Sequence, residues 1–297
     1  MSHDGEPAVD AALVGERRHL MSLAFRMLGT VAEAEDAVQE TYVRWYRMGP
    51  SERDQIQVPR AWLTRVASRI CLDMLGSARA RRERYVGPWL PEPVPISAFT
   101  ETAIDPLDQV TLDDSVSTAL LVVLEAMTPP ERVAFVLHDV FSVPFPEIAQ
   151  IVGRTPAACR QLAASARARV RTAQARTVSR EEHDRVVRAF AAAGRSGDLQ
   201  TLIAVLDPDV VLYSDGGGRA RAARNPVHGA DRVARFLLGT MRKRADVEVV
   251  GQETSDGLGF VMWCEGRIFG VLTLEAQAGR IATVRMVLNP DKLSLWN

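Results

Sequence analysis

The sequence predicts a chain of several domains, in which two all-helical domains precede an α+β domain. In residues 11–80 and 112–176, apolar side chains recur at steps of three and four, which places them on one face of a helix. After residue 180, two short helical segments give way to a pattern with a period of two, which is typical of strands. Tight-turn signals separate these strands at Asp256-Gly257, Glu265-Gly266 and Ala278-Gly279. With 297 residues, of which 47% are hydrophobic, the chain can bury more than one core.

Composition limits the classes of function. The net charge of −1 gives no overall attraction to nucleic acid, so any such signal must be local. Cys71, Cys159 and Cys264 are odd in number, far apart and set in apolar patterns, which indicates buried thiols in a reducing compartment and no metal site. The longest apolar run, at 119–124, is too short to cross a bilayer, and residues 1–10 do not resemble a signal peptide. We therefore expect a cytoplasmic protein with no metal, no cofactor and no membrane contact.

The first helical domain contains a helix with two different faces. A capping box from Thr30 to Glu33 begins a helix that we expect to end near residue 48. One face is apolar, and the opposite face carries a mixed set of charges, which are usually only solvated but can also bind a protein partner. The polar residues in question are Asp36, Gln39, Glu40 and Arg44.

A second helix, expected over 61–75 after a polar loop at 50–59, carries arginines beside a tryptophan. Arg60, Trp62, Arg65 and Arg69 lie along one edge of it. Bases stack on aromatic rings while guanidinium groups meet phosphates, so this edge suits single-stranded nucleic acid. A packed Trp62 with surface arginines explains the same pattern equally well.

Residues 144–171 predict a helix-turn-helix. Pro146 and Pro156 suit first helical turns, Gly153 suits the left-handed position after the first helix, and Thr155 can cap the second. Residues 148–180 contain seven arginines and no acidic residue, which favours phosphate binding, although a solvated arginine-rich helix is the alternative. The candidate DNA-contacting residues are Arg154, Thr155, Ala157, Arg160, Gln161, Ala164, Arg167, Arg169 and Arg171.

Together these segments resemble a known family. The strings DAVQETYVRWY at 36–46 and RAWLTRVASRICLDML at 60–75 resemble the promoter-melting domain of extracytoplasmic-function (ECF) sigma factors, and residues 128–171 resemble their −35-reading domain. The resemblance implies that the polar face at Asp36 to Arg44 binds core RNA polymerase. It also implies that the edge from Arg60 to Arg69 opens the −10 element, and that the helix-turn-helix reads the −35 element of promoter DNA.

The last domain resembles the cone-shaped NTF2-like fold of SnoaL-type proteins, on its order of two helices, strand, helix and several strands. Such cones have an apolar pocket that could hold an unknown small ligand, with Tyr213, Asp215, His228, Trp263, Glu265 and Arg285 as candidate lining. Spacing picks out no acid–base pair among them, and each is better explained as a core, surface or helix-entry residue. We therefore expect no catalytic residues.

Three strings resemble a subgroup of ECF sigma factors that carry a fused SnoaL-like domain. They are WLPEP (Trp89, Leu90, Pro91, Glu92, Pro93), DGGGR (Asp215, Gly216, Gly217, Gly218, Arg219) and NPDK (Asn289, Pro290, Asp291, Lys292). The resemblance implies that linker and glycine loop meet, and that the fused domain regulates the sigma factor in place of a separate anti-sigma factor. Read alone, the first string is an ordinary proline-rich linker and the second a flexible loop.

The sequence thus predicts a sigma factor regulated by its own C-terminal domain. The expected parts are region 2 at 11–80, a linker at 81–111, region 4 at 112–176 and an NTF2-like domain at 180–297. A SnoaL-like enzyme is one alternative, and a ligand-responsive DNA-binding repressor is the other. The redundancy of the DNA-binding pattern across two domains favours the sigma factor.

Overall fold

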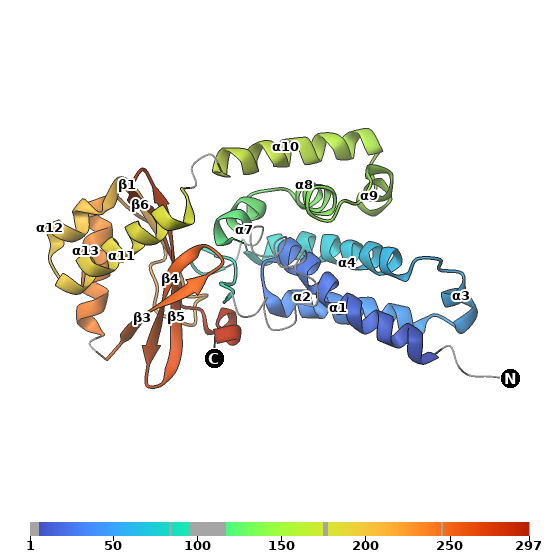
Figure 1. The fold of residues 1–297 in the computed structure, drawn as a ribbon, viewed down its shortest axis with the longest axis horizontal. Helices are drawn as coiled ribbons and strands as arrows, with labels where there is room; N and C mark the ends of the chain where they lie inside the picture. Colours follow the sequence, from blue (N-terminus) through green and yellow to red (C-terminus); the bar gives the residue numbers. More distant parts are fainter. Residues whose placement is uncertain (1–5, 83–84, 96–116, 175–177, 245, 297) are drawn as a thin grey trace. The chain divides into compact units, whose positions relative to one another are not determined.

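A computed structural model describes residues 6–82, 85–95, 117–174, 178–244 and 246–296 (Figure 1). The chain forms two compact units, one of Met1–Arg81 with Val123–Val170 and one of Arg82–Val122 with Arg171–Asn297. Most of the expected linker and the first residues expected for region 4 fall on 96–116, which lie outside the described residues.

The first unit is helical. Its elements are α1 (Glu6–Leu28), α2 (Val31–Arg47), α3 (Pro50–Asp54), α4 (Pro59–Arg82), α7 (Thr118–Glu125, shared with the second unit), α8 (Pro129–Phe135), the π-helix η1 (Val136–Val140), α9 (Phe145–Val152) and α10 (Pro156–Gln174). Within the described ranges, no helix is long and apolar enough to cross a membrane.

Local signals explain where these helices begin. The Thr30 hydroxyl accepts a hydrogen bond from the Glu33 N–H at 3.4 Å, as the capping signal predicts. The segment 50–59, expected to be a polar loop, contains the short helix α3. Pro50 starts this short helix, and the Glu52 carboxylate accepts the Gly49 N–H at 2.8 Å. The helix expected over 61–75 is longer at both ends.

Buried leucines and a buried arginine hold the first unit together. Leu20, Leu23 and Leu63 are at most 1% exposed and form part of its core. Arg132 of α8 is 2% exposed and donates to the carbonyls of Met27 at 2.6 Å and Leu124 at 2.8 Å. Its partners are thus the last turn of α1 and the last turn of α7, where helix carbonyls lack partners of their own.

The cysteines follow the expected pattern in two cases of three. Cys71 and Cys159 are buried, and burial raises the pKa of the Cys71 thiol to about 12. Cys264 is partly exposed instead, and its thiol donates to Asp246 at 3.0 Å.

The second unit contains a six-stranded sheet of order β2-β1-β6-β5-β4-β3. Its elements are α11 (Arg180–Ser196), α12 (Leu199–Ala204), β1 (Leu206–Asp215), β2 (Val227–His228), α13 (Ala230–Lys243), β3 (Glu248–Thr254), β4 (Gly257–Cys264), β5 (Arg267–Gln277), β6 (Arg280–Val287), η2 (Pro290–Lys292) and η3 (Ser294–Trp296). The strands from β3 to β6 are antiparallel, as their turn signals predict, but β1 runs parallel to β6.

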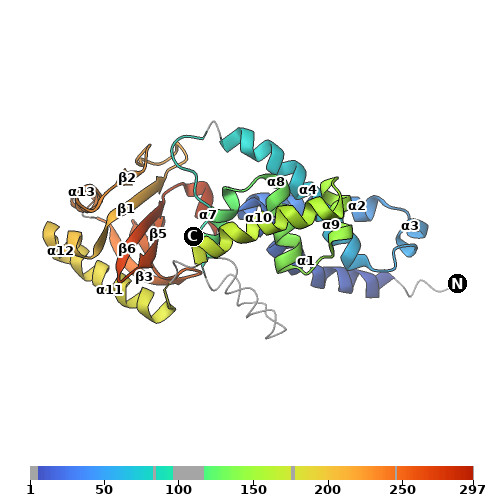
Figure 2. The same ribbon diagram turned by 90° about the horizontal axis from the view of Figure 1, so that it is seen from above.

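The two faces of this sheet have different covers. One face packs on α11, α12 and α13, which lie together on one side of it (Figures 1 and 2). The other face carries a smaller apolar cluster, into which Leu90 of the linker and Leu293 of the C-terminal turns pack. A segment that lies well before the domain in the sequence therefore completes its core.

Candidate nucleic-acid interface and linker clasp

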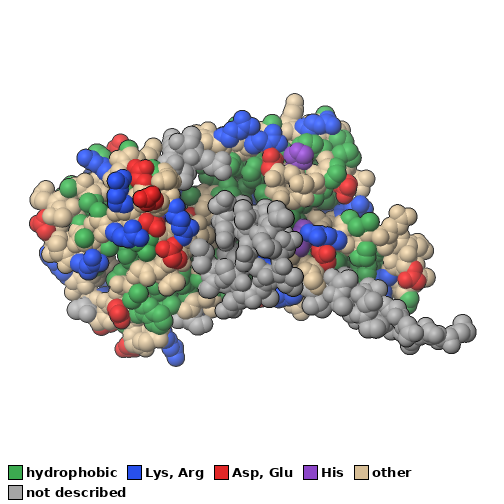
Figure 3. All heavy atoms as spheres, viewed as in Figure 1, with side chains coloured by type: hydrophobic (Ala, Val, Ile, Leu, Met, Phe, Trp, Pro, Cys, Tyr) green, Lys and Arg blue, Asp and Glu red, His purple; other side chains and the backbone are tan. Residues whose placement is uncertain are grey.

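The helix-turn-helix has the caps that the sequence predicts. Gly153 is left-handed at φ 69°, and the Thr155 hydroxyl accepts the Ala158 N–H at 3.2 Å at the start of α10. Cys159, Ala166 and Val170 are buried on one side of α10. Of the predicted DNA-contacting residues, only Arg167 is half-buried. The others are exposed: Arg154, Thr155, Ala157, Arg160, Gln161, Ala164, Arg169 and Arg171. Basic side chains gather over α10 in Figure 3, and the basic residues of this helix are all arginines.

The arginines of α10 differ in their partners. Arg167 donates to both carboxylate oxygens of Asp139, at 2.6 and 3.3 Å, and these hydrogen bonds raise its pKa. Arg169 donates to the Ala126 carbonyl at 3.0 Å. Arg160 instead lies over the Phe145 ring, 5.6 Å from its centroid. Sequence reasoning treated these arginines as one cationic surface, and the structure separates them.

On α4, the predicted −10 edge is partly engaged within region 2. Trp62 is half-buried and packs edge-to-face on Trp45 with ring centroids 5.2 Å apart, as the packing alternative predicts. Arg60 lies 3.1 Å from His19 and 3.4 Å from Glu16 of α1. Arg65 and Arg69 are exposed.

The polar face of α2 borders a groove that the sequence did not indicate. Asp36, Gln39 and Arg44 are exposed, and Glu40 pairs with Arg44 at 2.8 Å. Beside them, α1 and α2 enclose a hollow of about 640 Å³. Its lining is Arg17, Glu35, Val38, Gln39, Tyr42, Val43, Tyr46 and Arg47. Tyr46 is 53% exposed, so this face offers apolar as well as charged area.

In the second unit, the three strings meet around Asp215. Its carboxylate is fully buried and accepts from the Tyr85 hydroxyl at 2.6 Å, the Leu90 N–H at 2.9 Å and the Lys292 ammonium at 2.8 Å. We call Tyr85, Leu90, Asp215, Asn289 and Lys292 the clasp. Burial, and then the hydrogen bond to Asp215, raise the pKa of Tyr85.

Lys292 and Asn289 complete this network. The Lys292 ammonium also donates to the Leu90 carbonyl and lies over the Trp89 ring, 4.0 Å from its centroid. The Asn289 amide donates to the Tyr85 hydroxyl at 2.9 Å. A buried charge is tolerated only when paired and hydrogen-bonded, and both ionic groups here meet that condition.

The remaining residues of the strings lie around the clasp. Arg219 pairs with Asp291 at 2.8 Å on the surface, and Glu92 is buried near Ser294. Gly217 has φ 57°, and a Cβ there would lie 2.4 Å from Asn289 and 2.8 Å from Tyr85. Sequence reasoning missed Tyr85, and also Trp296, whose indole N–H donates to the Pro93 carbonyl at 2.8 Å.

The six candidate pocket residues of the last domain have different surroundings among the described residues. Asp215 belongs to the clasp, Tyr213 and Trp263 pack on the linker-covered face, and His228 is exposed on β2. Arg285 pairs with Glu275 at 2.7 Å. A hollow of about 320 Å³ lies beside β3 and β4. Of the six candidates, Trp263 and Glu265 are the ones that line this hollow in the described part of the chain. Among the described residues, no group of His, Cys, Asp or Glu side chains could hold a metal ion.

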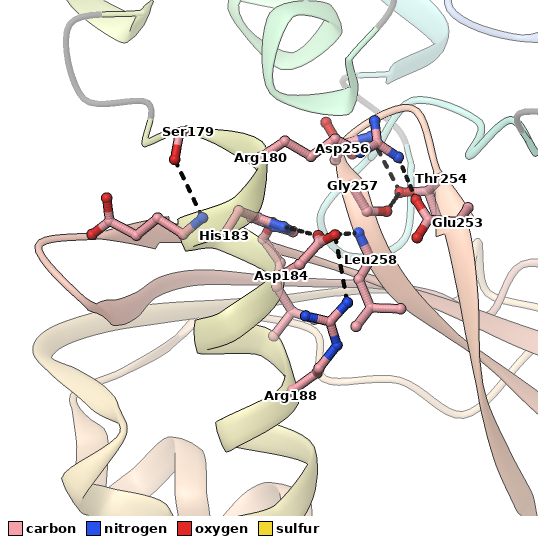
Figure 4. Close-up of polar contacts among 12 residues, drawn as sticks. Ser179, Arg180, His183, Asp184, Arg188, Glu253, Thr254, Asp256, Gly257 and Leu258 are labelled. Carbon is pink, nitrogen blue, oxygen red and sulfur yellow. Dashed lines mark hydrogen bonds and ion pairs between the residues drawn. The ribbon is translucent and has the colours of Figure 1, made fainter.

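The start of α11 is fixed to the turn between β3 and β4 (Figure 4). His183 contacts the Leu274 carbonyl at 3.0 Å, and the Asp184 carboxylate accepts the Leu258 N–H at 2.9 Å. Burial raises the pKa of Asp184, but its hydrogen bonds outweigh this and leave it below its usual value. The same turn holds Asp256, which accepts the Ala119 N–H at 3.3 Å. These hydrogen bonds fix the start of α11 to the sheet, while the second carboxylate oxygen of Asp256 is buried without a hydrogen-bond partner among the described residues.

Comparisons with known proteins give the family. The Sigma-70 region 2 model matches residues 13–81, and the Sigma-70, region 4 model matches residues 117–170. The ECF RNA polymerase sigma factor SigJ of Mycobacterium tuberculosis is 41% identical over 291 residues, which cover 94% of this chain and 91% of SigJ. The probable ECF RNA polymerase sigma factor SigI of the same species is 38% identical over 96% of this chain and 94% of its own length.

A solved structure of SigJ agrees with this family. The crystal structure of Mycobacterium tuberculosis SigJ has a TM-score of 0.71 and 38% identity, and covers 97% of this chain and 98% of SigJ. The sigma factor RpoE of Bartonella quintana, solved with the anti-sigma factor NepR, covers 56% of this chain and 96% of its own at a TM-score of 0.41 and 16% identity. The chain belongs to the ECF RNA polymerase sigma factors. It is a promoter-specificity subunit of bacterial RNA polymerase, and its C-terminal α+β domain has the expected NTF2-like architecture.

Proposed function

We propose that this sigma factor reads the −35 element with α10, opens the −10 element with the edge of α4, and binds core polymerase through the polar face of α2. The observation that carries the first part is the exposure of Arg160 and Gln161 on the first half of a capped second helix. In helix-turn-helix proteins this half enters the major groove and contacts base edges. Arg171, further along and exposed, is placed to meet phosphate.

Promoter transcription tests the reading helix. Arg160→Ala or Gln161→Ala in the reconstituted holoenzyme should relax base preference at the −35 element, at a cost of about 1–3 kcal/mol per lost base contact. Arg171→Ala should weaken binding to all sequences alike and lower its salt dependence. Unchanged −35 preference in both reading-helix variants would contradict the assignment.

The α2 face is tested by co-purification with core RNA polymerase. Charge reversal at Asp36 or Glu40 should weaken the complex, because both carboxylates lie on the polar face of α2. Asp73→Lys on α4 is a matched control, since Asp73 is exposed on another helix. Equal core binding by all three folded variants would argue against this surface.

We further propose that the C-terminal domain regulates the sigma factor through the clasp and not through chemistry. Region 2 at 11–80 and region 4 at 112–176 flank the linker at 81–111, so a domain that holds the linker biases the separation of the two promoter-reading domains. Trp89→Ala, Asp215→Ala and removal of residues 289–297 should alter transcription in the same direction. If Trp89→Ala leaves both transcription and protease resistance of the linker as in the parent, the clasp does not regulate.

Two finer expectations remain predictions. Family membership does not support the absence of a separate anti-sigma factor, since RpoE of Bartonella quintana was solved in complex with one. A small ligand, if the C-terminal domain binds one, has the hollow beside Trp263 as a candidate position. Co-purification of the chain from its own cells addresses the first, and a thermal-shift screen of the full chain addresses the second.

A further inference from the structure

Among the described residues, the guanidinium of Arg160 contacts an aromatic ring and no carboxylate. Its central carbon lies 5.6 Å from the centroid of the Phe145 ring. A cation within about 6 Å of a ring centroid is attracted by the ring's electron density. Phe145 is the first residue of α9 and is half-buried, so the ring itself is held by the fold.

His138 in turn supports the Phe145 ring. The imidazole and phenyl centroids are 3.9 Å apart, with 30° between the ring planes. His138 Nδ1 lies 3.1 Å from the Val143 carbonyl oxygen. A carbonyl oxygen can only accept, so Nδ1 carries the proton, and this bond fixes the plane of the imidazole.

A π-helix places His138 for this contact. Residues Val136–Val140 form η1, in which the Phe141 N–H donates to the Val136 carbonyl at 3.2 Å. Such wide turns are rare and occur often at functional sites. The extra residue in the turn shifts the following side chains around the helix axis. Here the shift occurs between α8 and α9 and brings an imidazole against the first residue of α9.

The difference between stacking and ion pairing decides what Arg160 can still bind. Two N–H groups of Arg167 donate hydrogen bonds to Asp139 and are therefore not available to DNA. In the described part of the chain, the structure gives Arg160 no carboxylate partner. A guanidinium that is attracted to a ring spends no N–H group on a carboxylate, so its N–H groups stay available for other acceptors. Those groups are the donors that a paired contact to guanine O6 and N7 requires.

We infer that Phe145, supported by His138, is a positioning residue for −35 readout: it holds Arg160 in place while leaving its donors free. The inference rests on the proposed role of Arg160 in reading the −35 element. Ordering the long side chain before DNA arrives lowers the entropy lost on binding. Losing the ring should therefore weaken discrimination at the base that Arg160 reads by roughly two- to fivefold.

The test is a base-preference profile of the −35 element, measured with reconstituted holoenzyme on promoters randomised there. Phe145→Leu keeps apolar bulk and removes the ring, and we expect preference to fall at one −35 position only. Phe145→Tyr restores a ring and should restore the profile. Phe269→Leu is the matched control, because it removes another ring that lies under an arginine, Arg244, in the other unit. It should leave the profile unchanged.

The double variant Arg160→Ala, Phe145→Leu separates positioning from general structure. If the ring acts through Arg160, adding Phe145→Leu to Arg160→Ala changes nothing further. An equal loss in both backgrounds, or a loss that Phe145→Tyr does not restore, would overturn the inference. If Arg160→Ala changes the profile while Phe145→Leu does not, the positioning role fails and the reading role stands. If Arg160→Ala itself has no effect, the proposed reading role fails first.

Discussion

The two faces of the C-terminal sheet are covered by segments of different origin. On one face, apolar side chains such as Val187 of α11, Leu202 of α12 and Leu237 of α13 pack on the strands. On the other, residues 85–95 and the C-terminal turns cover a smaller cluster, and the buried pair of Asp215 and Lys292 joins them. One cover consists of helices of the domain itself, and the other combines the domain's C-terminal turns with a segment from outside the domain.

This difference indicates which of the two covering segments can leave the sheet without unfolding the domain. The helix-covered face cannot open without exposing most of the domain's core. We expect the linker to be able to leave while sheet and helices persist, because the apolar cluster that Leu90 joins is smaller than the one under the helices. Local opening of this kind costs less than global unfolding and is typical of regulatory segments.

The largest expected effect comes from Asp215→Ala. It leaves the Lys292 ammonium, 4% exposed, without its carboxylate, and should destabilise the closed linker by about 3–5 kcal/mol. Chymotrypsin cleavage within residues 85–95 should accelerate while the helical signal of the domain stays. Asp209→Ala, an exposed aspartate of the same strand, is the control. Equal cleavage of both variants would break the distinction between the two faces.

The same truncation on either face sharpens the comparison. Leu202→Ala on the helix face and Leu90→Ala on the linker face each remove a side chain that is at most 3% exposed, at a cost of roughly 2–5 kcal/mol. We expect Leu202→Ala to lower the denaturant midpoint of the whole domain and Leu90→Ala mainly to release the linker. Urea unfolding followed by circular dichroism, beside proteolysis, measures both. Identical behaviour would mean that linker and domain unfold as one unit.

A glycine substitution probes the tightness of the clasp. Gly217→Ala places a methyl group 2.4 Å from Asn289 in a left-handed residue, and should cost about 1–3 kcal/mol in linker protection. Gly239→Ala, in the interior of α13 with open space around it, should be neutral or stabilising by about 0.4–1 kcal/mol. Hydrogen exchange at the Leu90 amide reports the first effect, and it should not change in the control.

The smallest effect is expected at the surface. Arg219→Ala removes an ion pair whose side chains are 62% and 58% exposed, so linker protection should change by less than about 1 kcal/mol. That change should vanish at high salt. A loss as large as that of Asp215→Ala would show that the glycine loop, and not the buried pair, fixes the linker.

Sequence patterns predicted what local chemistry determines. Gly153 and Thr155 set the helix boundaries of the helix-turn-helix, as their chemistry predicts. Gly153 adopts the left-handed conformation and the Thr155 hydroxyl caps α10. The hairpin turns at Glu265-Gly266 and Ala278-Gly279 likewise have positive φ at each residue. The three strings could be brought to one site only through a family resemblance, because no local period relates Leu90 to Asp215.

The remainder depends on contacts between distant residues or on subtle backbone choices. Tyr85 lies outside any motif, yet its hydroxyl donates to Asp215 across 130 residues. The parallel pairing of β1 with β6 has no local signal, since a period of two marks a strand but not the direction of its neighbour. The support of the Phe145 ring under Arg160 involves His138 of a π-helix, which no sequence period marks. Spacing therefore found the cationic surface but could not tell which of its arginines have partners.

Because the clasp residues are far apart in the sequence, the ribosome makes the linker long before it makes Lys292. Lys292 follows Leu90 by 202 residues and Asp215 by 77. At about 5–20 residues per second, the linker waits roughly 10–40 seconds before its ammonium partner has been made. Both promoter-reading regions leave the ribosome within that interval. Each new molecule thus passes through a stage in which regions 2 and 4 exist and nothing yet ties down the linker between them.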